Sequence, residues 1–400
     1  MKPSRVDEMI SRQEGISKVC RSNIQEIQLK KLNDLLAREK SRAGFYARLP
    51  EKLSSLEELS SLPFTTEEDL AKNAGSLLLV SQSDIQRILS DATSGTTGLP
   101  KRVFYTLQDC RNTIELYKAG LGEFIFPGNK TLICMPFSGP FGLGELIAAA
   151  VEELGATPLK VGVGKTFAQL EEIIAEEQPD TFVGLPSHLY AILTVLGPMS
   201  LKRALISGDA CPVSMTKRIE ELLGTKLFPH YGSREMGMAG AITCPAHEGM
   251  HLRENHIIAE IIDEEGNVLP YGEEGELVIT TIGMEAMPLI RYRTGDYTRI
   301  LPEKCACGSE TLRLDLLRRK GNPGKILSLD EILFSINEIV DYKAEQSEKG
   351  LQLHLLVTNL LVEDSIGKLF PNAQLHLQLV TKEDGPLYLG KRILQDGITH

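Results

Sequence analysis

Residues 181–208, TFVGLPSHLYAILTVLGPMSLKRALISG, decide the fold of this chain. The segment begins and ends with short apolar runs, TFVGLP and RALISG, which have the composition of buried strands. Two further strand-like runs precede it, TLICMPF at 131–137 and ATPLKVG at 156–162. They alternate with two helical runs, GLGELIAAAVEELG at 142–155 and FAQLEEIIAEEQ at 167–178. Because such alternation is typical of a parallel sheet covered by helices, we expect an α/β fold with this sheet over 131–210.

The sequence changes character on the C-terminal side of this segment. From 256 to 300, short strand-like runs alternate with turns, which predicts an antiparallel region attached to the parallel sheet. Farther on, the pattern predicts a helix over 328–340, then half-exposed strands at 342–347, 351–357 and 373–380. We place a domain boundary near Arg319. It divides the chain into a large domain, residues 1–318, and a small mobile α+β domain, residues 319–400.

The N-terminal side is expected to be helical. Apolar residues at helical spacing predict a helix over 16–42. Thr65 or Thr66, followed by acidic residues, indicates the capped start of another helix within 62–70.

The composition argues against several classes of protein. With 400 residues, of which 42% are hydrophobic, the chain can form more than one domain. A net charge of −11 without a basic run argues against a nucleic-acid surface. The N-terminus lacks the apolar core of a signal peptide, and no stretch approaches the roughly 18 apolar residues of a membrane span. Because seven cysteines also argue against a secreted disulfide scaffold, we expect a cytoplasmic protein that binds neither nucleic acid nor membrane.

The segment SDATSGTTGLPKRVFYT, residues 90–106, gathers small and hydroxyl residues before a lysine. Gly95 and Gly98 allow the backbone to curl so that several N–H groups point at one anion. The candidate donors around them are Thr93, Ser94, Thr96, Thr97 and Lys101. The order differs from G-x-x-x-x-G-K-[ST] and from G-x-G-x-x-G. A surface loop without a ligand is the alternative, but the order S-G-T-T-G-x-P-K is more restrictive than composition and favours phosphate binding.

This order resembles the phosphate-binding loop of the adenylate-forming superfamily, which includes acyl-CoA synthetases, peptide-synthetase adenylation domains and luciferases. Other segments resemble its phenylacetate–CoA ligase branch in the same order: AGFYARL at 43–49, SLEELSSLPFTTEEDL at 55–70, HYGSREMG at 230–237, AMPLIRYRTGDYTRI at 286–300 and LYLGKRILQD at 387–396. The resemblance covers nearly the whole chain. It implies that ATP activates a small, preferably aromatic, carboxylic acid as an acyl-adenylate. Coenzyme A then takes up the acyl group.

The resemblance also implies a site. The loop Thr93–Gly98 with Lys101 would hold the β- and γ-phosphates, and Glu235 would bind Mg²⁺, which favours carboxylate oxygens. Lys391 would reach the carboxylate and the α-phosphate from the small domain, as the catalytic lysine. The implied adenosine contacts are Tyr231 with Gly232 at the adenine, Gly208 and Asp209 lining the base, Asp296 at the ribose hydroxyls, and Arg319 or Lys320 at the hinge.

The chain departs from the family pattern at two places. In Y-G-x-[ST]-E, the hydroxyl that contacts the α-phosphate is replaced by Arg234, which can bind phosphate through two N–H groups and is our second catalytic candidate. The hinge reads RRKGN where relatives have G-R-x-D-D, so the hinge aspartate is missing.

Two alternatives therefore stay open. One is an adenylating enzyme that loads a carrier-protein thiol or another nucleophile, and the other is a non-catalytic nucleotide-binding relative. The resemblance places the acyl pocket near CMPFSGPFGLGEL, residues 134–146.

Two short clusters of cysteine and histidine suggest a metal. They supply Cys244, His247, His251, Cys305 and Cys307, and zinc takes four such ligands in a tetrahedron. Relatives that carry the same C-x-C have a cysteine and a G-[LM]-H upstream. This resemblance favours Cys244, His251, Cys305 and Cys307 as a structural zinc site, with His247 as the substitute. Two unrelated turns that hold buried thiols are the alternative.

Overall fold

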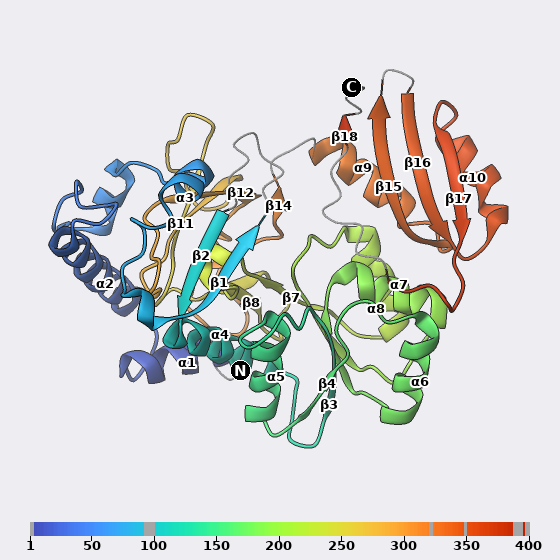
Figure 1. The fold of residues 1–400 in the computed structure, drawn as a ribbon, viewed down its shortest axis with the longest axis horizontal. Coiled ribbons are helices and arrows are strands. Elements are labelled where there is room, and N and C mark those ends of the chain that lie inside the picture. The colour runs from blue at the N-terminus through green and yellow to red at the C-terminus, as the bar shows by residue number, and fades with distance from the viewer. Residues whose placement is uncertain (1–3, 92–100, 320–322, 348–349, 387–394, 397–400) are drawn as a thin grey trace. The chain divides into compact units, whose positions relative to one another are not determined.

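The structure is a computed structural model, and it describes residues 4–91, 101–319, 323–347, 350–386 and 395–396 (Figure 1). The chain forms two compact units. Unit 1 comprises residues 1–124, 138–154 and 229–319, and unit 2 comprises 125–137, 155–228 and 320–400. These units differ from the predicted domains, 1–318 and 319–400, because unit 2 joins residues 320–400 to two earlier segments. The predicted division stays a prediction.

Unit 2 contains the parallel sheet that the sequence predicts. Its strands run in the order β6-β5-β3-β4 and all pair in parallel: β3 (Lys130–Cys134), β4 (Thr157–Lys160), β5 (Thr181–Gly184) and β6 (Arg203–Ile206). Three helices accompany them, α6 (Phe167–Glu177), α7 (Pro186–Leu196) and α8 (Val213–Leu223). All four residues of β5 are buried, which explains its continuous apolar sequence. The predicted α/β fold is confirmed.

The C-terminal part of unit 2 forms a second sheet, in the order β17-β16-β15-β18 (Figure 1). Its elements are α9 (Pro323–Leu333), β15 (Ile339–Ser347), β16 (Gly350–Val357), η4 (Leu360–Val362), α10 (Glu363–Leu369), β17 (Gln374–Leu379) and β18 (Gln395–Asp396). The three predicted strands are confirmed. The helix predicted over 328–340 was wrong at both ends, because it begins at Pro323 and ends at Leu333. The buried β-branched pair Ile339 and Val340 belongs to β15 instead.

The two sheets of unit 2 share one hydrophobic core. Phe334, which follows α9, lies edge-on against Tyr190 of α7, with ring centroids 5.2 Å apart. The C-terminal segment also caps two helices of the parallel sheet. The Glu331 carboxylate accepts hydrogen bonds from the backbone N–H groups of Val213 and Ser214, at 2.7 and 2.8 Å, at the start of α8.

A second cap lies at the start of α6, where backbone carbonyls take the place of a carboxylate. The carbonyl of Asp384 accepts from the N–H of Phe167 at 2.6 Å, and the carbonyl of Lys382 accepts from Ala168 at 2.8 Å. The first N–H groups of a helix have no partner within the helix, so both caps satisfy donors that α6 and α8 cannot satisfy themselves.

Unit 1 begins with helices and one hairpin. Its helical elements are α1 (Arg5–Glu14), α2 (Arg21–Arg42), η1 (Leu56–Ser61), α3 (Glu67–Asn73), η2 (Gln82–Asp84), α4 (Leu107–Leu121), α5 (Leu143–Glu153) and η3 (Arg234–Met236). The hairpin pairs β1 (Ile85–Asp91) with β2 (Lys101–Thr106). Thr66 caps α3 in a reciprocal capping box with Asp69, so the predicted helix start is confirmed. The first long helix begins at Arg21, later than the predicted residue 16.

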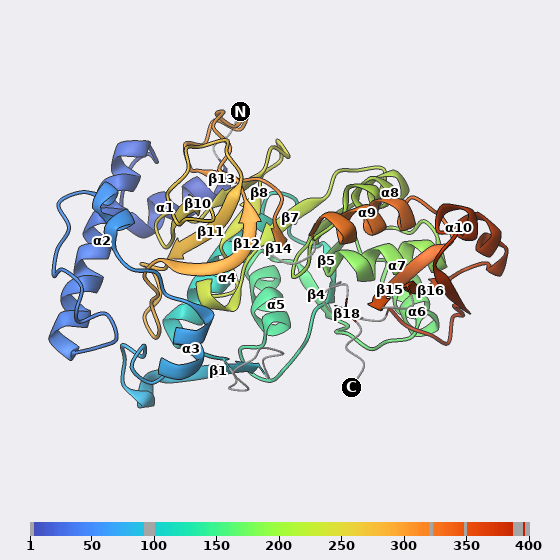
Figure 2. The same cartoon turned by 90° about the horizontal axis from the view of Figure 1, so that it is seen from above.

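Antiparallel strands complete unit 1, as predicted for 256–300. One sheet has the order β10-β11-β12-β14, from β10 (Ile258–Ile262), β11 (Gly275–Thr280), β12 (Tyr292–Thr298) and β14 (Arg318–Arg319) (Figure 2). A second group pairs β7 (Phe228–Tyr231), β8 (Ala241–Thr243), β9 (Met250–Leu252) and β13 (Arg313–Leu314). Within the described ranges, no helix combines the length and the apolar character that crossing a bilayer requires.

Candidate active site and metal cluster

A buried ion pair lies where the sequence predicts phosphate and Mg²⁺ contacts. Lys101 begins β2, and its Nζ lies 2.5 Å from the Glu235 carboxylate of η3 and 3.3 Å from Glu67. Burial alone would lower the pKa of Lys101 and raise the pKa of Glu235. The opposite charge outweighs burial in both groups, so the pKa of Lys101 is raised and that of Glu235 is lowered. Both groups are therefore charged at neutral pH.

The predicted adenosine contacts of unit 1 also come together. Tyr231, at the end of β7, donates a hydrogen bond of 2.7 Å to the carboxylate of Asp296 on β12. Gly232 follows Tyr231, and a Cβ there would lie 2.4 Å from the carbonyl oxygen of Met238. Only glycine fits this close backbone approach, which fixes the turn between Tyr231 and η3.

Arginines add positive charge beside this turn. The backbone carbonyl of Arg234 accepts a hydrogen bond of 2.7 Å from the Tyr105 hydroxyl, which anchors η3 to β2. Arg87 of β1 is half-buried and donates to the carbonyl of Phe141. Burial lowers the pKa of Arg87, and the nearby charge of Arg234 lowers it further. Sequence reasoning missed Arg87, because one arginine in a strand carries no motif.

The other predicted nucleotide contacts belong to unit 2, to the end of unit 1 or to residues outside the described ranges. Gly208 and Asp209 belong to unit 2, where they follow the carboxyl end of β6 and Gly208 has a φ of 89°. Ligands of parallel sheets bind at such strand ends. Arg319 is described by its backbone, which pairs with Asp296 in the β12–β14 ladder. The loop residues Thr93, Ser94, Gly95, Thr96, Thr97 and Gly98, together with Lys320 and Lys391, lie outside the described residues.

The predicted acyl-pocket segment, 134–146, is divided between the units after Phe137. Its role stays a prediction.

The four favoured zinc ligands converge, although up to 63 positions separate them in sequence. One donor atom from each of Cys244, His251, Cys305 and Cys307 lies within 4.8 Å of the others, and all four residues are buried. The Sγ atoms of Cys244 and Cys305 are 3.6 Å apart, and Cys307 Sγ is 3.4 Å from His251 Nε2. His247, the substitute, lies outside this group. Three thiols and an imidazole around one point match the donor set of a structural zinc site.

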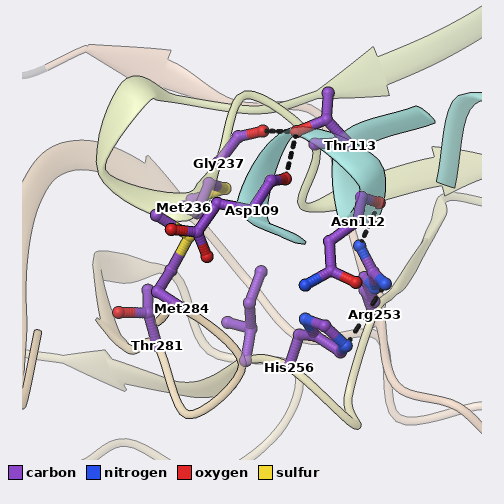
Figure 3. Close-up of a pocket in the computed structure, with 11 residues that line it drawn as sticks. Asp109, Asn112, Thr113, Met236, Gly237, Arg253, His256, Thr281 and Met284 are labelled. Atoms are coloured by element: carbon purple, nitrogen blue, oxygen red, sulfur yellow. Dashed lines mark hydrogen bonds between the residues drawn. The ribbon is translucent and has the colours of Figure 1, made fainter. Parts of the chain in front are cut away.

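A small cavity in unit 1 holds further residues that sequence reasoning missed (Figure 3). Arg253 donates to the carbonyl of Asn112 at 2.5 Å and lies 3.2 Å from the Nε2 of His256. Burial lowers the pKa of Arg253 to about 9, and burial together with the Arg253 charge holds the pKa of His256 well below its usual value. The cavity leaves about 10 Å³ for the centre of a water molecule. That is room for about one water, so the cavity as it stands is too small for an aromatic acid.

Comparison with known proteins agrees with this geometry. A family model described as AMP-binding enzyme matches residues 91–286. A phenylacetate–coenzyme A ligase of Aromatoleum evansii is 32% identical over 311 residues, which cover 72% of this chain and 69% of the relative. The chain belongs to the phenylacetate–CoA ligase-like branch of the adenylate-forming superfamily.

Other relatives of this branch extend the match. A phenylacetate–coenzyme A ligase of Thermus thermophilus is 29% identical, over 80% of this chain and 78% of that protein. Among solved structures, a 2-hydroxyisobutyryl-CoA ligase in complex with its acyl-adenylate has a TM-score of 0.76 and 19% identity, and the match covers 94% of this chain and 90% of that one. The structural likeness shows the fold. The chain is an AMP-forming acid–thiol ligase, which activates a carboxylic acid with ATP and transfers the acyl group to coenzyme A.

Proposed function

We propose that the substrate of this ligase is a small aromatic carboxylic acid. The observation that carries the proposal is the match to phenylacetate–coenzyme A ligases from Aromatoleum evansii, Thermus thermophilus, Pseudomonas putida and Escherichia coli, at 29–34% identity. The family model of AMP-binding enzymes matches residues 91–286, which include the glycine-rich loop and Glu235.

Lys101 and Glu235 change partners in the proposed adenylation step. In the free protein each neutralises the other at 2.5 Å. With ATP bound, the ammonium of Lys101 would face the β- and γ-phosphates, and the Glu235 carboxylate would hold Mg²⁺, which would neutralise phosphate charge. In the free protein, the Lys101 charge outweighs burial and keeps the Glu235 carboxylate ionised, and Mg²⁺ would take the place of that charge. Arg234 and Lys391 then stabilise the charge that develops at the α-phosphate as the substrate carboxylate attacks.

Tyr231 and Asp296 orient the nucleoside. The hydrogen bond from the Tyr231 hydroxyl fixes the Asp296 carboxylate, which accepts from the ribose hydroxyls, while the Tyr231 ring lies against adenine. Gly208 and Asp209 line the base, and Arg319 or Lys320 lies at the hinge. Lys391 reaches the site when residues 319–400 close over it.

We also propose that Cys244, His251, Cys305 and Cys307 bind one zinc ion with a structural role. Four protein ligands leave no open position for catalysis, and the residues tie β9 to the segment before β13. Three of the donors are thiols that must stay reduced to bind metal. We therefore keep the expectation of a reducing, cytoplasmic location.

The experiment for the substrate is ATP–pyrophosphate exchange with a panel of aromatic and aliphatic acids, with and without Mg²⁺. Exchange that requires Mg²⁺ and favours arylacetic or benzoic acids supports the proposal. Product analysis with coenzyme A and with carrier proteins then separates the acceptors. Measurable ATP binding without exchange for any acid would instead favour a non-catalytic nucleotide-binding protein.

A further inference from the structure

A line of buried polar side chains connects the metal cluster to the first helix. Nδ1 of His251 lies 2.8 Å from the Thr311 hydroxyl, and that hydroxyl lies 2.7 Å from the hydroxyl of Ser309. The Ser309 hydroxyl lies 2.5 Å from Oδ1 of Asp7 in α1. All four residues are buried, and 302 positions separate Asp7 from Ser309 in the sequence.

The carboxylate end fixes the direction of every hydrogen bond in this line. Oδ1 of Asp7 accepts hydrogen bonds from the hydroxyls of Ser309 and Ser4, so the Ser309 hydroxyl donates to Asp7. Ser309 then accepts from the Thr311 hydroxyl, which leaves the Thr311 oxygen to accept from Nδ1–H of His251. The proton of the neutral imidazole is thereby placed on Nδ1. The lone pair remains on Nε2, which faces Cys307 Sγ at 3.4 Å inside the cluster.

Contacts of the N-terminal helices reinforce this connection. Arg21 of α2 forms an ion pair of 2.5 Å with buried Glu254, three residues beyond His251. The Glu254 carboxylate also accepts from the backbone N–H of Leu312 at 2.7 Å, next to Thr311. The helices therefore hold both strands that bring His251 and Thr311 together, since His251 pairs with Arg313 in the β9–β13 ladder.

We propose that Asp7 is a positioning residue of the metal site, which acts through Ser309 and Thr311 to select the metal-binding tautomer of His251. The proposal rests on the zinc site proposed above. Outer partners of this kind orient a ligating imidazole and commonly change metal affinity 10–100-fold. Because coupling between two sites is reciprocal, a metal held by His251 in turn stabilises the docked position of α1.

The test measures zinc release to a chromogenic chelator from the full-length protein. Asp7→Ala and Thr311→Val are both expected to accelerate release by about 10–100-fold, because each removes one hydrogen-bonding group of the line. The double variant should release zinc no faster than Thr311→Val, because the same line is already broken. Glu8→Gln is the matched control, since Glu8 lies on the same helix but is exposed, and it should match the wild type.

The outcomes separate this inference from the zinc proposal. Wild-type release rates in Asp7→Ala, together with accelerated release in Thr311→Val, would show that Asp7 does not contribute and would overturn its role. Additive effects in the double variant would overturn it as well. A wild-type protein that holds no zinc after reconstitution would overturn the metal site itself, whereas ATP–pyrophosphate exchange tests the ligase activity separately.

Hydrogen exchange supplies a second readout if Asp7→Ala folds poorly. Zinc removal from the wild type should raise exchange of the α1 amides, residues 5–14, more than exchange in α3, residues 67–73. Thr311→Val with zinc bound should show part of the same increase. Equal exchange of α1 with and without zinc would contradict the reciprocal coupling.

Discussion

Unit 1 contains two clusters of polar side chains that differ in how their charges and lone pairs are balanced. Around Lys101 and Glu235, opposite charges meet and satisfy each other before any ligand arrives. Around Cys244, His251, Cys305 and Cys307, four electron-pair donors lie within 4.8 Å, an arrangement that gains its stabilisation from a cation. In the first cluster, Lys101 and Glu235 must exchange each other for phosphate and Mg²⁺ during catalysis. The second cluster is suited to keep one bound zinc ion. The difference separates a site that turns over from a site that holds the fold.

The metal cluster gives the largest expected effect. Cys305→Ser/Cys307→Ser should abolish zinc binding. Because structural zinc can contribute about 10–16 kcal/mol of apparent binding free energy in zinc-finger peptides, its loss should lower the thermal stability of unit 1 strongly. Zinc content and thermal unfolding are the measurements. Cys20→Ser is the control, since Cys20 lies outside the cluster at the start of α2.

If Cys305→Ser/Cys307→Ser unfolded at the wild-type temperature, the cysteine and histidine cluster would have no structural role that distinguishes it from the ion pair. Chelation of wild-type protein tests the same point without a substitution, and it should lower the unfolding temperature.

Loss of one charge of the Lys101–Glu235 pair is expected to lower stability more than loss of both charges. Glu235→Gln leaves the ammonium of Lys101 buried with only Glu67 to compensate it, and should destabilise the free protein by up to about 3–5 kcal/mol. Lys101→Met/Glu235→Gln removes both charges and should be more stable than Glu235→Gln alone. Urea unfolding of the single and double variants measures this. A double variant less stable than Glu235→Gln would show that the pair supports the fold, as the metal cluster does.

The next largest effect is expected on catalysis, at Lys391. Lys391→Ala should slow adenylation about 10²–10³-fold, because the lysine stabilises charge that exists only in the transition state. Thioester formation from synthetic acyl-adenylate should be largely spared. Pyrophosphate exchange and thioester formation are measured on the same preparation. Equal losses in both assays would reject a role confined to adenylation.

The smallest effect is expected at the nucleoside. Asp296→Asn should weaken ATP binding by about 1–3 kcal/mol, and Tyr231→Phe by about 1 kcal/mol, through lost hydrogen bonds. Titration calorimetry with ATP measures both. Asp315→Asn is the control, because Asp315 pairs with exposed Arg299. If Asp296→Asn bound ATP as tightly as this control, Asp296 would be a structural residue.

The sequence predicted those parts of the structure that leave local patterns. Buried runs such as residues 181–184 revealed the parallel sheet, and Thr66 revealed the start of α3. The cysteine and histidine spacing predicted a cluster, the family resemblance favoured His251 over His247, and the structure places His251 beside the three cysteines. Asp7 and Arg253 could not be predicted, because their partners lie across the fold at distant sequence positions. The α9 boundaries failed because apolar residues fit either a helix or a buried strand.

The caps on α6 and α8 have a consequence for the synthesis of the chain on the ribosome. Glu331, Lys382 and Asp384 emerge after the helices whose first N–H groups they satisfy. Until then, the first turns of α6 and α8 depend on water, and apolar residues such as Tyr190 lack their partner Phe334. The layer of α6, α7 and α8 on the nascent parallel sheet is therefore incomplete until the residues up to Asp384 have been made. In unit 2, residues that are made later finish a core that earlier residues began, so completion of this fold waits for the segment that contains Glu331, Phe334 and Asp384.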